Sequence, residues 1–98
     1  MKLNHEYLKT LVLNIENIPF SRPHLEMIFE SIGIDDLNED FLLHYEVLHE
    51  NNFIIGAGNA DDIGLVEHDG GVDWSNSQIR LTAKGHEFAA AMRQEEVW

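Results

Sequence analysis

The stretch "QIRLTAKGHEFAAAMRQEEVW", residues 78–98, decides the fold class. Ile79 and Leu81 alternate with polar residues, and this period of two predicts a short strand with one buried face. Thr82 is expected to be the N-cap of a helix that follows at once. The chain therefore is expected to end as a strand that runs into a capped helix over residues 83–97. The apolar face of that helix is predicted to consist of Phe88, Ala91, Met92 and Trp98.

Three helices are predicted upstream of this strand. Residues 5–17 carry apolar residues at helical spacing, and Asn4 precedes them as a cap. A second helix is expected to begin with Ser21 as its cap and Pro23 in its first turn, and to end at Gly33. A third helix is predicted over residues 38–51, with Asn38 as its cap. Its expected core face is Phe41, Leu42, Tyr45 and Leu48.

The segment between the third helix and the final strand is short of regular structure. Residues 53–57, "FIIGA", are apolar and β-branched, which favours a strand. The next twenty residues are rich in Gly, Asn, Asp and Ser, and contain a short predicted strand at 63–67 and a turn at "HDGG". Three helices followed by a hairpin and a C-terminal helix are the arrangement of a winged helix-turn-helix domain. We therefore expect one α+β domain over residues 1–98, with a β-hairpin wing.

The C-terminal stretch "RLTAKGHEF", followed by Arg93 and the pair Val97–Trp98, resembles a bacterial and phage family catalogued as domain of unknown function 2513. "HYEVLHENNFI" is similar to the third helix of that family, with His44 at the position of its histidine, and "LKTLVLNIEN" is similar to its first helix. Ala83, Ala89 and Asn52 depart from the usual tryptophan, leucine and glycine. The resemblance implies a winged-helix-like fold but no assigned activity.

Four residues of these motifs are expected to have structural roles: Thr82, Gly85, His86 and His44. Thr82 should cap the last helix, and Gly85 should let another segment approach closely. His86 and Glu87 point about 100° apart on a helix, which is unfavourable for joint catalysis. His86 and His44 are therefore interpreted as buried or hydrogen-bonded structural histidines.

Motifs for catalysis, cofactor binding or metal binding are weak in this sequence. The chain has no cysteine, and His44 and His49 are five residues apart, which is poor spacing for one metal ion. The loop after Asp69 has Trp74 and Arg80 where a calcium loop requires glycine and glutamate. "GAGNAD" lacks the third glycine of a dinucleotide motif. We therefore predict no enzyme activity, no cofactor and no metal site.

Charge is the strongest functional signal in the sequence. The chain has 18 acidic and 6 basic residues, a formal net charge of −12. No lysine or arginine occurs between Arg22 and Arg80, although this window would form the DNA-reading surface of a winged helix. The acids predicted to form a protein-binding surface are Glu39, Asp40, Glu46, Glu50, Asp61, Asp62, Glu67, Asp69 and Asp73.

Several functions remain open at this stage. The first is a cytoplasmic regulator or inhibitor, encoded by a phage or mobile element, that imitates the charge of DNA and binds a protein with a basic surface. The second is a DNA-binding regulator that acts as a dimer through its basic ends: Lys2, Lys9, Arg22, Arg80, Lys84 and Arg93. The third is an enzyme, which the weak motifs disfavour. The remaining alternative is an acidic domain whose charge serves only solubility. DNA is disfavoured as a partner but not excluded.

Homodimerisation is a separate question. The last helix contains the small residues Ala89–Ala91, which allow close helix approach, and ends in a tryptophan. A homodimer and self-packing of the tryptophan remain equal alternatives. The expected dimer contacts are Phe88, Met92, Val97 and Trp98. No run of residues is long and apolar enough to be a membrane anchor, so no membrane partner is expected.

Overall fold

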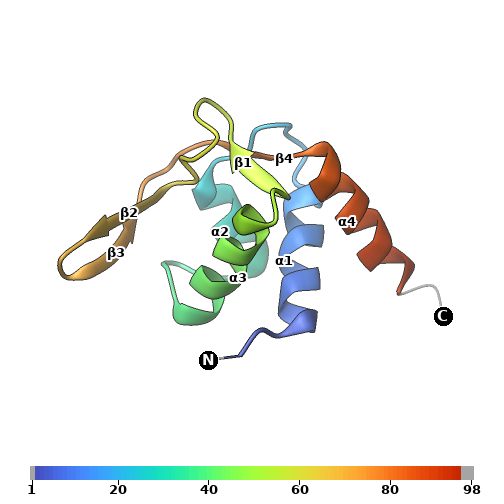
Figure 1. The fold of residues 1–98 in the computed structure, drawn as a ribbon, viewed down its shortest axis with the longest axis horizontal. Coiled ribbons are helices and arrows are strands. Elements are labelled where there is room, and N and C mark those ends of the chain that lie inside the picture. Colours follow the sequence, from blue (N-terminus) through green and yellow to red (C-terminus); the bar gives the residue numbers. More distant parts are fainter. Residues whose placement is uncertain (1, 96–98) are drawn as a thin grey trace.

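Four helices, a small sheet and a projecting hairpin make up the computed structural model, which describes residues 2–95 (Figure 1). The sheet strands β1 and β4 lie across one end of the helices, the hairpin β2–β3 projects to one side, and α4 lies at the opposite side. In chain order the elements are α1 (His5–Asn17), α2 (Leu25–Ile32), α3 (Glu39–Glu50), β1 (Ile54–Gly56), β2 (Leu65–His68), β3 (Gly71–Trp74), β4 (Ile79–Leu81) and α4 (Ala83–Gln94).

Three of the predicted helix caps are confirmed. Asn4 Oδ1 accepts a hydrogen bond from the Tyr7 amide at 3.1 Å, and Asn38 Oδ1 accepts one from the Phe41 amide at 2.8 Å. Thr82 Oγ1 accepts a hydrogen bond from the Gly85 amide at 2.9 Å. Each cap satisfies an amide that the first turn of a helix leaves without a partner.

The predicted start of the second helix is wrong. The helix begins at Leu25 with His24 as its N-cap, and Ser21 and Pro23 lie before it. The backbone here is held by distant residues instead: the Ile79 amide donates to the Pro23 carbonyl at 3.0 Å. The Leu25 amide donates to the Ser77 carbonyl at 3.1 Å. These bonds hold the segment beside β4, where His24 is extended and forms an isolated β-bridge with Gln78.

The sheet has the topology of a winged helix. Strands β1 and β4 are antiparallel, with Ile54 opposite Leu81 and Gly56 opposite Ile79. An isolated bridge between His24 and Gln78 adds the segment before α2 to the free side of β4. The order is therefore helix, bridge strand, two helices, strand, wing, strand and helix, which confirms an α+β fold with a winged-helix-like arrangement.

The core lies between α1, α2, α3 and the sheet, with α4 closing one side. The stripes of α1 and α3 predicted from helical spacing are mostly confirmed, although Leu42 is only half-buried. On α4 the predicted apolar face is confirmed at Met92, which is buried, and at Phe88, which is partly buried, but it is wrong at Ala91, which is exposed while Ala89 is buried. Among residues 2–95 no helix combines the length and apolarity needed to span a bilayer.

Two of the four expected dimer contacts, Phe88 and Met92, pack against other residues of the same chain. Met92 is buried in the core, and the Phe88 ring stacks on the Phe53 ring with centroids 4.3 Å apart. Both side chains therefore attach α4 to its own domain. Val97 and Trp98 lie outside the described residues, so their part of the dimer prediction is untouched, as is the last part of the helix predicted to residue 97.

Gly85 fills the structural role predicted for it. A Cβ at this position would overlap the Phe53 carbonyl oxygen, in the segment that leads into β1. Thr82 contacts the same segment, because its hydroxyl donates to the Asn52 carbonyl at 2.5 Å. The first turn of α4 is thus pressed against the backbone before β1, and only glycine permits this approach.

We expect Gly85→Ala to lower the free energy of unfolding by about 1–3 kcal/mol, because the methyl group must displace backbone. Gly58→Ala is the matched control, since a Cβ there meets no atom within 4 Å. Urea denaturation of both variants measures the difference. Equal stabilities for the two would show that the contact between α4 and Phe53 is looser than described.

Candidate protein-binding surface

The wing is the segment between β1 and β4, and its outer part is the hairpin β2–β3. Leu65 lies opposite Trp74 and Glu67 opposite Val72. Because side chains alternate along a strand, these four side chains share one face of the hairpin. Leu65 and Trp74 are partly buried against the core. This face therefore turns toward the helices, and Glu67 extends it outward.

Two side chains of α3 hold the base of the wing. The buried Tyr45 hydroxyl donates a hydrogen bond to the Ile63 carbonyl at 2.7 Å. His49 Nε2 donates to the Ala60 carbonyl at 3.1 Å. Burial and the nearby Asp62 carboxylate raise the pKa of Tyr45. The phenol is therefore a fixed neutral donor, and the segment before β2 is tied to α3.

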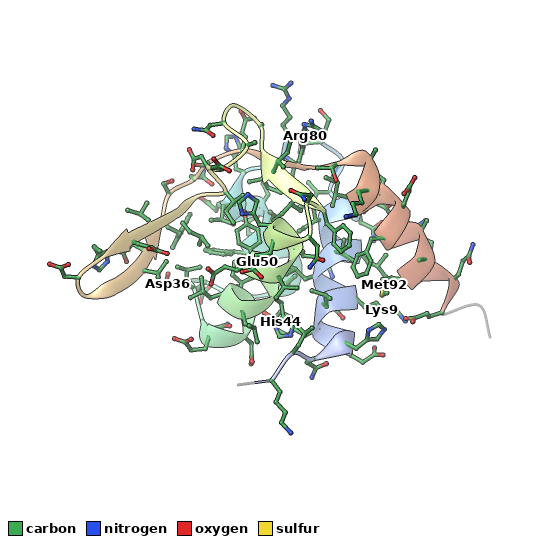
Figure 2. The ribbon with its side chains drawn as sticks, in the orientation of Figure 1. Lys9, Asp36, His44, Glu50, Arg80 and Met92 are labelled. Carbon is green, nitrogen blue, oxygen red and sulfur yellow. The ribbon has the colours of Figure 1, made fainter. Side chains whose placement is uncertain are left out.

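A third contact holds the other strand of the hairpin. Trp74 Nε1 donates a hydrogen bond to Asp36 Oδ1 at 2.9 Å, and the Trp74 ring meets Phe29 edge to face at 4.7 Å. Figure 2 shows Asp36 on the side of the helices from which the hairpin projects. The wing is thus fixed to the α2–α3 loop as well as to α3.

These contacts bring three acidic side chains together: Glu46 and Glu50 of α3 and Glu67 of β2. Partial burial, together with the charges of Glu50 and then Glu67, raises the pKa of the Glu46 carboxyl above its ordinary value. We call these three residues the α3–wing cluster. All three are exposed, and Glu67 follows Glu50 by 17 positions in the sequence. This surface stabilises positive charge and disfavours a further anion.

The remaining predicted acids lie elsewhere on the exposed surface. Glu39 and Asp40 are in the first turn of α3. Asp40 lies near Tyr7 of α1: burial of Tyr7, and then the negative charge of Asp40, raise the pKa of the Tyr7 hydroxyl. Asp61 and Asp62 are in the turn before β2, where Asp62 Oδ1 accepts from the Gly64 amide at 3.1 Å. Asp69 and Asp73 complete the outer hairpin.

The hairpin tip has its own hydrogen-bond network. His68 Nδ1 accepts from the Gly70 amide at 3.0 Å, so its proton lies on Nε2 and points to Asp73 Oδ2 at 2.8 Å. The same imidazole therefore closes the turn and binds the opposite strand. Asp73 is consequently engaged within the hairpin, which separates it from the α3–wing cluster.

Acids that the sequence reasoning did not place in the site lie beside Trp74. They are Glu26 and Glu30 on α2, and Asp35 and Asp36 in the loop that follows. The usable signals in the sequence were Trp74, a large aromatic residue in an otherwise polar segment, and the acid-rich end of the second helix. Which acids it would meet depends on the wing's orientation, which is a tertiary property.

Several basic residues make contacts within the chain. Lys9 Nζ lies 4.0 Å from Glu95 Oε2, and Arg93 pairs with Glu16. Lys84 lies over the Phe53 ring at 5.8 Å, and the Arg80 guanidinium donates to the Leu81 carbonyl. Figure 2 shows Arg80 at the sheet edge and Lys9 low on α1. These four basic residues therefore each contact another group of the same chain.

The two motif histidines have different surroundings. His44 is fully buried: the Asn4 amide donates to its Nε2 at 2.9 Å, and its Nδ1 donates to the Asp40 carbonyl at 2.6 Å. The predicted structural role of His44 is confirmed. His86 was expected to be buried or hydrogen-bonded; it is not buried, since 60% of its side chain is exposed, and its Nδ1 lies 3.8 Å from Glu16 Oε2. Among residues 2–95 no three His, Cys, Asp or Glu residues are arranged to hold a metal ion.

We expect Glu46→Gln to raise the free energy of unfolding at neutral pH by about 0.2–0.5 kcal/mol, because it removes like-charge repulsion. A raised pKa means that the ionised carboxylate costs stability above that pKa. The advantage should therefore shrink as the pH falls through it. Thermal melts from neutral to acidic pH measure this. Glu87→Gln on α4 is the control, and an equal gain there would contradict the cluster.

We expect His44→Phe to lower the free energy of unfolding by about 1–3 kcal/mol. The Asn4 backbone amide would lose its acceptor at Nε2, and the Asp40 carbonyl would lose its donor at Nδ1. His86→Phe makes the same change at an exposed site and should alter stability by less than about 0.5 kcal/mol. Urea unfolding compares them. A larger loss at His86 would contradict the assignment.

Comparisons with protein-family profiles, with curated proteins and with solved structures found no match to this chain. The fold and the surface described above therefore rest on the residues of the chain itself. The resemblance of its C-terminal stretch to domain of unknown function 2513 stays a prediction.

Proposed function

We propose that this chain is a non-catalytic, cytoplasmic winged-helix-like protein that binds a basic surface of another protein through α3 and the wing. The observation that carries the proposal is the α3–wing cluster, in which partial burial, the charge of Glu50 and then that of Glu67 in the wing raise the pKa of Glu46. A folded chain accepts this repulsion at some cost, and a cation placed between the carboxylates removes the cost.

The anchoring of the wing supports the same proposal. Tyr45 and Trp74 fix the hairpin relative to α3, so the carboxylates are held in place before a partner arrives. Preorganisation lowers the ordering cost of binding. A fixed array of negative charge also attracts a basic partner over a distance and accelerates encounter at low salt. Such an array imitates the phosphates that a nucleic-acid-binding protein recognises, which suits a phage-encoded regulator or inhibitor.

DNA is the less favoured partner. Proteins gain affinity for DNA by neutralising phosphates with lysine and arginine. The window from residue 23 to residue 79 contains neither. Lys9 and Arg93, which the dimeric DNA-binding alternative requires, are next to Glu95 and Glu16.

The test compares two double variants of equal net charge. Glu46→Gln/Glu67→Gln removes two charges from the α3–wing cluster, and Glu6→Gln/Glu87→Gln removes two from α1 and α4. Each is used as bait in the native cytoplasm, and captured proteins are identified by mass spectrometry. We expect the wild type and the α1/α4 variant to capture the same basic protein, and the cluster variant to bind it about tenfold more weakly.

Two results contradict the proposal. One is equal capture by all three baits, which shows that the cluster does not contribute. The other is retention of duplex DNA by micromolar wild-type protein at about 50 mM salt in a gel-shift assay, which favours the DNA-binding alternative. Under the proposal, the protein–protein affinity instead falls as salt is raised and as Glu46 becomes protonated.

A further inference from the structure

A pocket lies where the wing meets α2 and the loop that follows it. Its volume is about 280 Å³, and it is lined by Glu26, Phe29, Glu30, Ile34, Asp35 and Trp74. Pockets for drug-sized ligands are usually about 300–1,000 Å³. This Trp74 pocket is therefore of a size for one long side chain rather than for a cofactor.

The walls of the Trp74 pocket combine aromatic and acidic groups. Trp74 and Phe29 provide the aromatic surface, and the hydrogen bond from Trp74 Nε1 to Asp36 fixes the indole ring. Glu26 and Glu30 stand one helical turn apart on α2, and Asp35 follows in the next loop. Acidic residues from two segments thus line the pocket together with Trp74. Among residues 2–95, no lysine, arginine or histidine lines the pocket.

We propose that the Trp74 pocket binds an arginine side chain of the basic partner. A guanidinium stacks on an aromatic ring and donates its N–H groups to several carboxylates at once, whereas an ammonium is a compact, strongly hydrated charge. The aliphatic stem of arginine packs against Ile34 at the apolar wall. These contacts compensate for the water that the guanidinium and the carboxylates lose on binding. The pocket is therefore selective for the planar guanidinium over an ammonium group.

This inference deepens the proposed function and rests on it, because the pocket and the α3–wing cluster lie along one face of the hairpin. Glu67 and Trp74 belong to that face, as the register of β2 and β3 requires. A basic segment that reaches from the pocket to the cluster meets acids along its path. The arginine is then its anchor, and the cluster neutralises further positive charges.

The experiment uses small probes, so that it does not depend on the identity of the partner. Nα-acetyl-argininamide is titrated into the ¹⁵N-labelled full chain, and the indole N–H signal of Trp74 is followed by NMR. That signal is assigned as the one lost in Trp74→Phe. We expect saturable shifts at Trp74, Glu26, Glu30 and Asp35, with an affinity in the millimolar range. The neutral analogue Nα-acetyl-citrullinamide should bind at least about tenfold more weakly.

Variants locate the effect. Glu26→Gln/Glu30→Gln should reduce the affinity for the arginine probe about tenfold, whereas Glu6→Gln/Glu87→Gln, with the same net charge, should not. Three results overturn the inference: equal binding of the citrulline probe, tighter binding of Nα-acetyl-lysinamide, or shifts spread over all acidic regions. If the probe fails while the α3–wing cluster variant still loses its partner, only the pocket is wrong. If the probe does not bind and the α3–wing cluster variant also keeps its partner, both the pocket and the proposed function are wrong.

Discussion

The hydrogen bond from the buried Tyr45 hydroxyl to the Ile63 carbonyl is the contact on which the shape of this molecule depends. Tyr45 also stacks on Phe41, with ring centroids 4.9 Å apart, so it belongs to the core of the helices. Tyr45 therefore joins the core of the helices to the base of the wing, and His49 supports it by donating to the Ala60 carbonyl. Without this bond and the Trp74–Asp36 contact, the position of Glu67 relative to α3 would be undefined.

Local signals predicted the parts of the fold that depend on nearby residues. The caps Asn4, Asn38 and Thr82 act within three residues of their own positions, and Gly33 ends α2 with a φ of 81°. Ser21 failed as a cap because Pro23 and Leu25 bond to residues more than fifty positions away. The strand β3 was missed for the same reason, since its identity depends on pairing with β2 across a turn.

The candidate site was predictable in kind but not in arrangement. The absence of bases from residue 23 to residue 79 is visible in the sequence, and it identified an acidic wing and an acidic third helix. Which acids meet was decided by the direction of the hairpin. Glu67 joins Glu46, whereas Asp73 turns to His68 and Asp40 acts on Tyr7. The position of the acids near Trp74 also depends on the direction of the hairpin, because α2 and β3 are far apart in sequence.

The hairpin has a consequence for how copies of this protein behave toward each other. Its sheet consists of the two strands β2 and β3, and Val66 is 48% exposed on it. A narrow ribbon with apolar residues is a template on which another chain could add strands and aggregate. Glu67, Asp69 and Asp73 place negative charge along the ribbon, so two copies repel each other edge to edge. The charges proposed for recognition would thereby also keep a concentrated solution of the protein from polymerising.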